Sequence, residues 1–482
     1  MNLIADCIAH KKHIYLVGIK GTGVCAFAEL LLSAGACISG SDVADTFYTD
    51  VILKELAVKY GEGFDAENVP RGAALVVHSA AWNAENNVEL AEAKRRGVPT
   101  LTYTEALGMY SALFDSAGVA GVHGKTTTTA IAGALAAALG LKTKVLAGSA
   151  ISSFGGRCSL NLGDKYFIAE TCEYRRHFLS FKPRRILLTS VESDHQDYYP
   201  DYASIRDAFV EYVSLLPEGG RLIFCADDAG AREVAERAAR NGELSFQYGF
   251  SAKGPWRIEY CAVKNEELRF KLEAFEREFS LVVPGRHNAL NAAGALALLY
   301  EMYVSDRGEL SVSEREEFAG KAAAALKEFR GGKRRAEIIG ERRGVIFMDD
   351  YGHHPTAIKA TLRALREFYP ERRLIVSFMP HTYSRTAALL DSFAGSFEDA
   401  GLVILHKIYA SPRETDRRGI DGRTLFEETR RRHPNVVYVE NHEDVLKDAG
   451  LLPKSNSLFL TLGAGDNWKL GRSIYERYGD RE

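Results

Sequence analysis

The chain has 482 residues, of which 46% are hydrophobic, and a formal net charge of −3 at neutral pH. This length is typical of about three domains. The small net charge provides no general attraction for nucleic acid or an anionic membrane surface. No apolar stretch approaches the ~20 residues that span a membrane, and the N-terminus lacks a signal-peptide pattern. We therefore expect a cytoplasmic protein without membrane insertion and without a nucleic-acid partner.

Cysteine usage supports the same compartment. The seven cysteines are scattered, and none of them forms a Cys-x-x-Cys motif. An odd number of widely spaced cysteines argues against a disulfide framework and indicates a reducing environment.

The first segment, residues 1–110, alternates strand-like and helical patterns. His13–Val17 is an expected strand, Val24–Ser33 an expected helix, and Ala36–Ser39 and Leu75–Ser79 are two further expected strands. This β-α-β alternation predicts a parallel, doubly wound sheet and hence a Rossmann-like domain.

A glycine-rich turn follows the first expected strand and is a candidate phosphate site. The run Gly18-Ile19-Lys20-Gly21-Thr22-Gly23 would present backbone N–H groups at a helix start. Asp42 stands where a dinucleotide-binding domain has its ribose-binding acid. The pattern suits NAD and a UDP-linked ligand equally, and a purely structural turn is a less favoured alternative.

The most specific motif is the run Ala-Gly-Val-His-Gly-Lys-Thr-Thr-Thr-Thr at 120–129, which opens an Ala-rich helical pattern in the central segment, residues 111–332. Such a junction gathers N–H groups and the positive end of a helix dipole, which is worth only about 0.3–2 kcal/mol per charge. Lys125 adds a fixed cation and Thr126 a hydroxyl suited to Mg²⁺. The run therefore predicts a triphosphate site, although Val119 occupies the first glycine position of the usual longer motif.

Two acidic clusters follow strand-like runs of this segment. Glu170 and Glu173 follow Tyr166–Ala169, whereas Glu192, Asp194, His195 and Asp197 follow Ile186–Ser190; a further strand is expected at Leu222–Cys225. Because ligands lie beyond the carboxyl ends of parallel strands, we expect both clusters to face the phosphate site and to bind Mg²⁺. Any single acid there could instead cap a helix.

The third segment, residues 333–482, predicts a second Rossmann-like α/β unit. Its expected strands are Val345–Asp349, Leu374–Phe378, Leu402–His406, Val436–Val439 and Leu458–Leu462. Polar loops at Asp349–Pro355, Pro380–Thr386 and Gly463–Asp466 follow strands, where catalytic loops belong. The boundary stretch, Phe329–Arg335, has two glycines and four cations, which suits a hinge that touches phosphate.

Taken in chain order, these motifs resemble the Mur ligases, in particular the alanine-adding branch. The stretches that carry the resemblance are Gly18–Gly23, Gly40–Asp42, Gly121–Thr129, Ala169–Leu179, Glu192–His195, Gly285–Asn291, Asp349–Pro355 and Pro380–Thr386. The resemblance implies a UDP-sugar-binding first domain, a central ATP-binding domain and a C-terminal ligase domain. It also implies that ATP activates the lactyl carboxylate of UDP-N-acetylmuramate as an acyl phosphate, which the amine of L-alanine then attacks.

The resemblance also implies roles for individual residues. The expected catalytic residues are Lys125, His195, His354 and Arg385, and the expected Mg²⁺ ligands are Thr126, Glu170 and His195. The expected ATP-binding residues are Gly121, Val122, His123, Gly124, Lys125, Thr126, Thr127, His287, Asn288, Asn291 and Arg330. The expected sugar-nucleotide-binding residues are Gly18, Lys20, Gly21, Thr22, Gly23, Ser41, Asp42 and Ser79. On chemistry alone, the two amides before the Ala-rich helix could equally be helix caps.

The chain departs from the family pattern after Glu170, where Glu170-Thr171-Cys172-Glu173-Tyr174-Arg175-Arg176-His177 replaces a more acidic run, and at Ser190, where an asparagine is usual. No lysine occurs between His195 and Gly220, which agrees with the alanine-adding branch. The alternatives are a ligase that recycles murein tripeptide, an NAD-dependent oxidoreductase and a non-catalytic ATP switch. The last two leave motifs of this chain unexplained.

Overall fold

The structure is a computed structural model that describes residues 2–196, 198–238, 244–410, 414 and 418–479. Contacts divide the chain into two units. The first comprises residues 1–192, 205–257 and 292–325, and the second comprises residues 193–204, 258–291 and 326–482.

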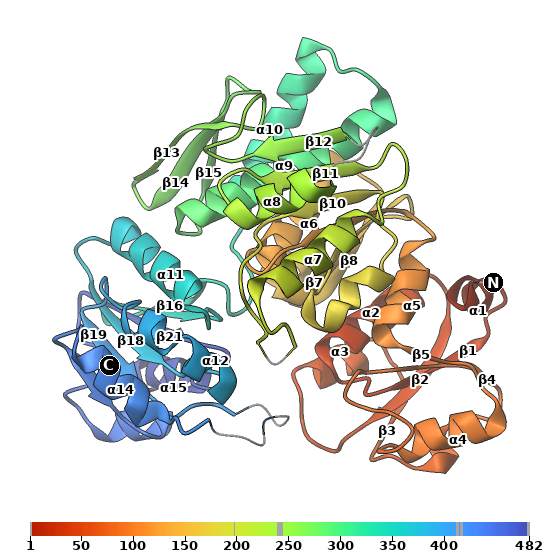
Figure 1. Cartoon of the computed structure of the whole chain (residues 1–482), viewed down its shortest axis with the longest axis horizontal. Coiled ribbons are helices and arrows are strands. Elements are labelled where there is room, and N and C mark those ends of the chain that lie inside the picture. Colours follow the sequence, from red (N-terminus) through yellow and green to blue (C-terminus); the bar gives the residue numbers. More distant parts are fainter. Residues whose placement is uncertain (1, 197, 239–243, 411–413, 415–417, 480–482) are drawn as a thin grey trace. The chain divides into compact units, whose positions relative to one another are not determined.

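The first unit begins with a five-stranded sheet in the order β3-β2-β1-β4-β5, and its neighbouring strands are all parallel (Figure 1). Its strands are β1 (His13–Val17), β2 (Cys37–Asp42), β3 (Tyr60–Glu62), β4 (Ala73–His78) and β5 (Thr100–Thr102). Its helices are α1 (Leu3–Ala9), α2 (Thr22–Ser33), α3 (Thr49–Glu55), the short η1 (Ala66–Asn68), α4 (Val88–Arg96) and α5 (Tyr103–Ser111). The predicted doubly wound sheet is confirmed.

Strand β2 extends three residues beyond its expected end. Gly40 pairs with Leu16 in the ladder, and a Cβ on Gly40 would lie 2.4 Å from the Leu16 carbonyl oxygen. Only a glycine permits this approach of the two backbones. Ser41 and Asp42 therefore belong to the strand and not to the loop after it.

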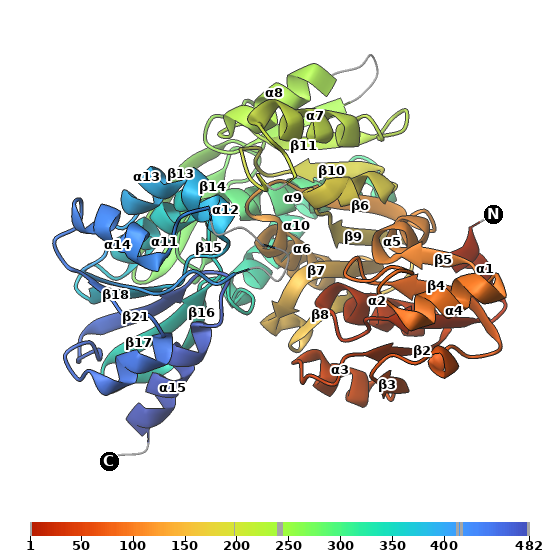
Figure 2. The ribbon, with the colours of Figure 1, turned by 60° about the horizontal axis from the view of Figure 1, so that its bottom comes forward.

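The second sheet of this unit has seven strands in the order β12-β11-β10-β6-β9-β7-β8 (Figure 2). They are β6 (Asp115–Ala120), β7 (Thr143–Ile151), β8 (Arg157–Asn161), β9 (Tyr166–Glu170), β10 (Arg185–Leu188), β11 (Arg221–Cys225) and β12 (Leu244–Tyr248). β8 is antiparallel to β7, and the other pairs are parallel. Strands such as β10 are buried along their whole length, as expected where helices cover both faces of a parallel sheet.

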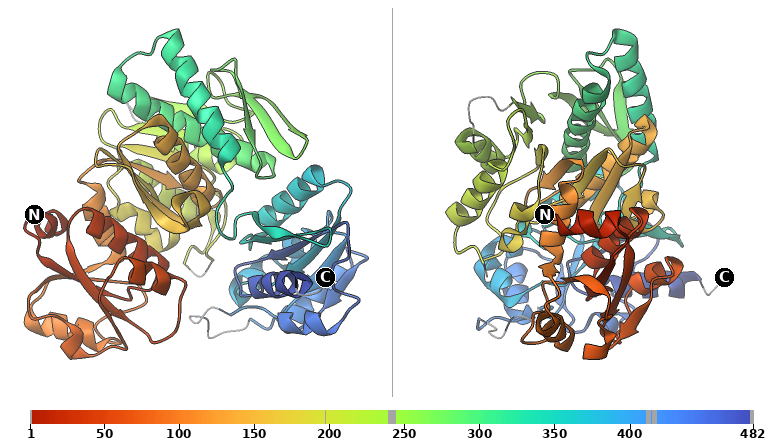
Figure 3. Two further views of the ribbon diagram at one scale, coloured as in Figure 1. Left: turned by 180° about the vertical axis from the view of Figure 1, so that it is seen from behind. Right: turned by 90° about the vertical axis from the view of Figure 1, so that its right-hand side faces the viewer.

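The helices of this region are α6 (Lys125–Leu139), η2 (Ser152–Phe154), η3 (Tyr174–Ser180), α7 (Tyr202–Val213), α8 (Ala229–Ala238), α9 (Arg286–Arg307) and α10 (Val312–Glu328). The long helices α9 and α10 lie side by side (Figure 3) and pack through Tyr300, Tyr303 and Phe318. In the part of the chain that the structure describes, no helix is long and apolar enough to cross a membrane.

The second unit has two sheets. β13 (Ile258–Lys264), β14 (Glu267–Leu272) and β15 (Glu278–Leu281) form an antiparallel meander that the sequence patterns did not predict. The other sheet has the order β16-β17-β21-β18-β19-β20. Its strands are β16 (Glu337–Arg342), β17 (Val345–Asp350), β18 (Arg373–Phe378), β19 (Leu402–Leu405), β20 (Val436–Tyr438) and β21 (Ser457–Leu462), of which β16 is antiparallel to its neighbour.

Helices α11 (Pro355–Phe368), α12 (Tyr383–Ala388), α13 (Leu390–Ala394), α14 (Gly422–Arg430), η4 (His442–Lys447) and α15 (Trp468–Gly479) belong to this sheet. All five strands expected in the third segment are present. A core of aromatic and aliphatic side chains, including Phe347, Phe459 and Ile474, packs α15 against the sheet. The predicted parallel α/β architecture is thus confirmed here as well.

Candidate active site

The turn between β6 and α6 depends on two glycines with positive φ. Gly121 has φ 139° and Gly124, the N-cap of α6, has φ 81°. A Cβ on Gly121 would lie 2.1 Å from Thr189 Oγ1 and 2.8 Å from the Ser190 nitrogen. The turn therefore requires glycine at 121 both for its backbone conformation and for space.

Lys125 opens α6, and its ammonium is held by acceptors from two elements. Nζ donates to Glu173 Oε2 at 2.8 Å, to the Val122 carbonyl at 3.3 Å and to the Gly121 carbonyl. Burial alone would lower the pKa of Lys125, but Glu173 and the more distant Cys172 and Glu170 outweigh it, and the pKa is raised. Lys125 is therefore a permanent cation at the phosphate turn.

The backbone of the turn is fixed by Ser190, which follows β10. The Val122 nitrogen donates to the Ser190 carbonyl at 2.9 Å, and the His123 nitrogen donates to Ser190 Oγ at 2.9 Å. The His123 ring in turn contacts the Glu192 carboxylate. Ser190 thus satisfies the turn with one hydroxyl and one carbonyl, so the departure from asparagine leaves the loop supported.

Glu170, a predicted metal ligand, ends β9 and is cradled by Gly148. The Gly148 nitrogen donates to Glu170 Oε2 at 2.7 Å, and a Cβ on Gly148 would come within 2.6 Å of both carboxylate oxygens. Thr126, the second residue of α6, is buried with 3% of its surface exposed. Hard oxygen donors of this kind suit Mg²⁺. Both residues belong to the first unit, whereas His195 belongs to the second.

A cavity of about 340 Å³ brings the glycine-rich turn of the N-terminal sheet together with Glu170. Its lining comprises Gly21, Thr22, Gly23, Val24, Ser79, Ala80, Thr102, Tyr103, Thr104, Leu107, Leu146, Ala147, Gly148, Glu170, Thr171, Cys172, His177, Phe178 and Phe181. Four expected sugar-nucleotide residues and one expected metal ligand therefore share one cavity. The sequence patterns missed the contributions of Tyr103 and His177, because neither stands in a phosphate-binding motif.

Three other expected sugar-nucleotide residues make contacts within the protein. Ser41 is fully buried and donates to Glu89, and both Asp42 oxygens accept backbone N–H groups, from Lys20 at 2.6 Å and from Val43 at 2.8 Å. The Lys20 ammonium donates to Glu62 at 3.1 Å and lies 3.3 Å from Asp50. Ser41 and Asp42 thus use their polar atoms in contacts within the protein, and Asp42 supports the glycine-rich turn through the Lys20 N–H group.

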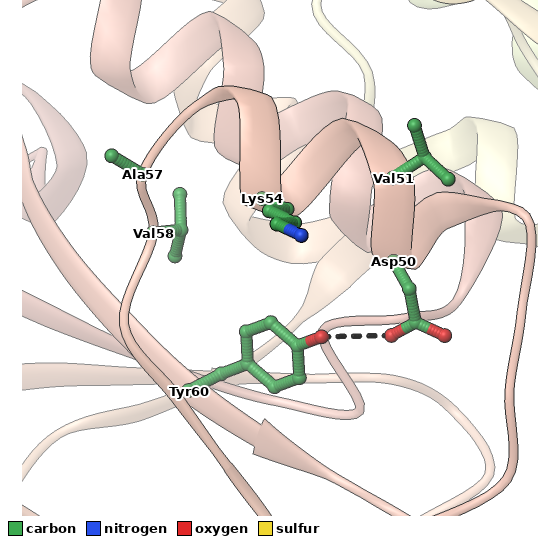
Figure 4. A pocket seen from close by; sticks show the side chains of 6 residues that line it. All are labelled: Asp50, Val51, Lys54, Ala57, Val58 and Tyr60. Carbon is green, nitrogen blue, oxygen red and sulfur yellow. Dashed lines mark hydrogen bonds between the residues drawn. The ribbon is translucent and has the colours of Figure 1, made fainter.

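Asp50, which lies beside the Lys20 ammonium, also lines a shallow pocket formed by α3 and β3. There it accepts a hydrogen bond of 2.8 Å from the Tyr60 hydroxyl (Figure 4). Lys20 lies over the Tyr60 ring, 5.4 Å from its centroid. The Lys20 side chain is only 1% exposed. Its charge is therefore compensated by carboxylates of the N-terminal sheet region.

In the second unit, Asp194 joins two predicted catalytic residues. Its Oδ1 accepts from Arg385 Nε at 3.1 Å and Nη2 at 2.8 Å, and from the His195 backbone nitrogen at 2.7 Å. Desolvation opposes ionisation of Asp194, but Arg385 and the neighbouring histidines hold its pKa well below the ordinary value. One buried carboxylate thus fixes both the loop that carries His195, whose φ is 55°, and the Arg385 guanidinium.

The loops expected to carry chemistry hold two further histidines near Arg385. The His353 and His381 rings are 6.2 Å apart, and His381 Nδ1 lies 3.5 Å from Arg385 Nη1. Burial, together with Arg385, lowers the pKa of His353 and lowers that of His381 to about 4. Asp349 is also buried, and desolvation raises its pKa to about 6 in spite of Arg334. His354 is the buried N-cap residue of α11.

The residues expected on the adenine side lie at the start of α9 and after α10. Asn288 donates to the Pro284 carbonyl at 2.7 Å, and Asn291 donates to Asn288 Oδ1 at 3.0 Å. Arg330 is exposed and donates to the Lys327 carbonyl at 2.8 Å. Neither asparagine contact is an N-capping bond, because both use the amide N–H as the donor, and the nucleotide role of these residues stays a prediction. Asp197, from the second acidic cluster, lies outside the described residues.

Three family models match the chain in order. They are the "Mur ligase family, catalytic domain" over residues 13–115, the "Mur ligase middle domain" over residues 119–299 and the "Mur ligase, glutamate ligase domain" over residues 334–465. The predicted three-domain α/β fold class and the resemblance are thereby confirmed. The exact domain boundaries at 110 and 332 stay predictions.

The chain is also similar to curated proteins and to solved structures. It is 50% identical over 467 residues to the UDP-N-acetylmuramate–L-alanine ligase of Treponema pallidum, which covers 96% of each chain. It is 38% identical over 463 residues to the enzyme of the same name from Borrelia garinii, covering 95% of this chain and 97% of that one. The structure of the UDP-N-acetylmuramate–alanine ligase of Thermotoga maritima matches with a TM-score of 0.77 at 24% identity, covering 98% of this chain and 100% of that one.

Proposed function

Because this chain belongs to the Mur ligase family, whose members depend on ATP, we propose that it joins L-alanine to UDP-N-acetylmuramate in the synthesis of peptidoglycan precursors. The observation that carries the proposal is the 50% identity, over nearly the full length of both chains, to a ligase of that name. The cavity that unites the glycine-rich turn with Glu170 supports it, since a sugar nucleotide and a metal-bound phosphate must meet in this reaction.

The chemical difficulty of this reaction is the approach of two anions. The lactyl carboxylate must attack the γ-phosphorus of ATP, with ADP as the leaving group and an acyl phosphate as the product. Lys125 is a permanent cation at the phosphate turn, and it offsets the repulsion between the two groups in the transition state. The amine of L-alanine then attacks the acyl carbon, phosphate leaves, and the amine loses a proton to give the amide.

We propose that Thr126 and Glu170 would hold one Mg²⁺ and that Glu170 and His195 would hold a second, near the acyl phosphate. When bound, the ions neutralise phosphate charge and polarise the oxygens of the transferred group. The Gly148 N–H fixes one Glu170 oxygen and so orients the carboxylate. Arg385, held by Asp194, is suited to contact a phosphate or carboxylate of the bound reactants.

The experiment that tests the function is an ADP-release assay with purified protein, UDP-N-acetylmuramate, ATP and Mg²⁺ against a panel of amino acids and the L-alanyl-γ-D-glutamyl tripeptide. We expect L-alanine to give the highest kcat/KM and a product heavier by one alanine residue in mass spectrometry. Preference for the tripeptide would establish the recycling reaction instead. ATP consumption that no amine stimulates would contradict ligase activity.

A further inference from the structure

The cavity that contains Glu170 is poor in positive charge. Among its lining residues, all of which the structure describes, Glu170 is the only carboxylate and His177 is the only side chain that can carry a positive charge near neutral pH. Lys20, the cation expected from the sequence, is compensated by Glu62 and Asp50 and is almost fully buried. Of the side chains that line the cavity, His177 is therefore the one whose protonation could offset the charge of a diphosphate.

The charge requirement rests on the proposed function, in which the cavity receives a diphosphate. The start of α2 at Thr22 presents N–H groups to this space. A helix N-terminus stabilises an anionic group near a surface only weakly. This contribution is small beside the two negative charges of a diphosphate, so a side-chain donor that can carry a positive charge would strengthen binding.

We propose that His177 contacts the diphosphate of the sugar nucleotide and takes the place that the sequence assigns to Lys20. His177 lies on η3, directly after two arginines with left-handed backbone conformations, Arg175 at φ 51° and Arg176 at φ 59°. A non-glycine residue with left-handed φ and ψ angles is strained, and such strain concentrates at ligand sites. The strained pair turns the chain sharply before His177.

The surrounding packing fixes this turn. The Arg176 nitrogen donates to the Glu173 carbonyl at 2.9 Å, and its guanidinium pairs with Glu211. On the other side of His177, the buried Phe178 ring stacks on Tyr212 with centroids 4.5 Å apart and an interplanar angle of 12°. The two neighbours of His177 are thus anchored to α7, and the imidazole lines the cavity between them.

The same segment connects the two ends of the site. Glu173, which holds Lys125, precedes η3, and the Phe178 nitrogen donates to the Cys172 carbonyl at 2.9 Å. A single short segment therefore supports the ammonium of Lys125 at the phosphate turn and also supplies His177 to the sugar-nucleotide cavity.

The test is calorimetric binding without ATP, using UDP and UDP-N-acetylmuramate as separate ligands. We expect His177→Ala to weaken both ligands by the same factor, about 10- to 100-fold, the scale of one charge-assisted hydrogen bond. We expect His177→Lys to recover most of the loss and His177→Gln little of it. Arg175→Ala is the matched control, because Arg175 is exposed on the same turn and does not line the cavity.

Three results separate the possibilities. Unchanged affinity of His177→Ala for both ligands, or weakened UDP-N-acetylmuramate binding with unchanged UDP binding, would overturn the diphosphate contact. Equal losses in His177→Ala and Arg175→Ala would show a structural effect of the turn and would also overturn it. If the unaltered protein bound neither ligand, the proposed function itself would be contradicted, whereas the His177 variants could not produce that result.

Discussion

Asp194 and Arg385 are 191 positions apart in the sequence, and they form a buried two-donor ion pair with distances of 3.1 and 2.8 Å to a single oxygen. Their side chains are 5% and 8% exposed. Residues 193–204 therefore belong to the same unit as the third segment, although the sequence patterns assign them to the central one. The pair attaches the loop with His195 to the loop with Arg385.

This pair leads to a stability prediction. Asp194→Asn removes the carboxylate and leaves the buried Arg385 charge uncompensated, which we expect to cost about 3–5 kcal/mol. The double variant Asp194→Asn/Arg385→Met should be more stable than the single variant, because the orphaned charge is gone. Urea denaturation of the unaltered protein, the two single variants Asp194→Asn and Arg385→Met, and the double variant measures these effects. Strictly additive losses would show that the two residues are not coupled.

Buried histidines predict how stability depends on pH. The pKa of His381 falls from 6.5 to about 4 on folding, mainly through burial and then through Arg385. The unfolded chain thus binds a proton that the folded chain excludes, and stability is lost as the pH falls from about 6.5 to about 4, by at most about 3 kcal/mol. His381→Gln should lessen this loss. Denaturation at several pH values measures it, with the exposed His10→Gln as control; equal pH dependence in all three proteins would contradict the assignment.

The regular part of the fold could be predicted from local patterns. The strand expected at His13–Val17 matches β1, and the motif at 120–129 located the start of α6 correctly. Buried parallel strands are continuous apolar runs, so their signal is strong. The antiparallel strands β13 and β16 were missed because most of their side chains are half exposed, which gives weak patterns. Strand β14 alternates polar and apolar side chains, which is typical of a strand, so the sequence did contain a signal for it.

The position of the turn at the candidate site was predictable from its motif, whereas the contacts of individual side chains were not. Gly121, Gly124 and Lys125 were located by their spacing alone. Lys20 stands inside a phosphate-type turn, yet its ammonium bonds to Glu62, which is 42 positions away. His177 lines the cavity because of a strained turn. Long-range ion pairs and backbone strain of this kind leave no local sequence pattern.

The crowding around Gly121 predicts that alanine is tolerated much less well at position 121 than at position 140. Gly121→Ala would place a Cβ 2.1 Å from Thr189 Oγ1 at φ 139°, and we expect loss of ATP binding together with a lowered melting temperature. Gly140→Ala is the matched control, because Gly140 also has positive φ, at 67°, but no atom lies within 4 Å of its Cβ position. It should cost only about 1 kcal/mol of backbone strain. Calorimetric ATP titration distinguishes them, and ATP affinity of Gly121→Ala equal to that of Gly140→Ala would contradict this reasoning.

Lys125 predicts a kinetic effect. Lys125→Ala removes the cation that offsets repulsion between carboxylate and phosphate, and kcat should fall by at least about 10²-fold. Lys142→Ala, an exposed lysine after the same helix, is the control and should retain activity. Steady-state ADP release measures both. Turnover of Lys125→Ala near that of the control would remove Lys125 from the mechanism.

The Glu173 carboxylate keeps Lys125 protonated, so its removal should alter the pH profile rather than only the rate. Burial lowers the pKa of Lys125, and the Glu173 carboxylate is the strongest influence that opposes this effect. The pKa of Lys125 should therefore fall in Glu173→Gln. Because the protonated form is the active one, the alkaline limb of kcat/KM for ATP should move to lower pH in measurements from about pH 6 to about pH 10. Glu211→Gln, which loses the ion pair with Arg176 on the same segment, should keep the unaltered profile. Profiles of Glu173→Gln and the unaltered enzyme that differ by a constant factor at every pH would show that Glu173 positions Lys125 without controlling its charge.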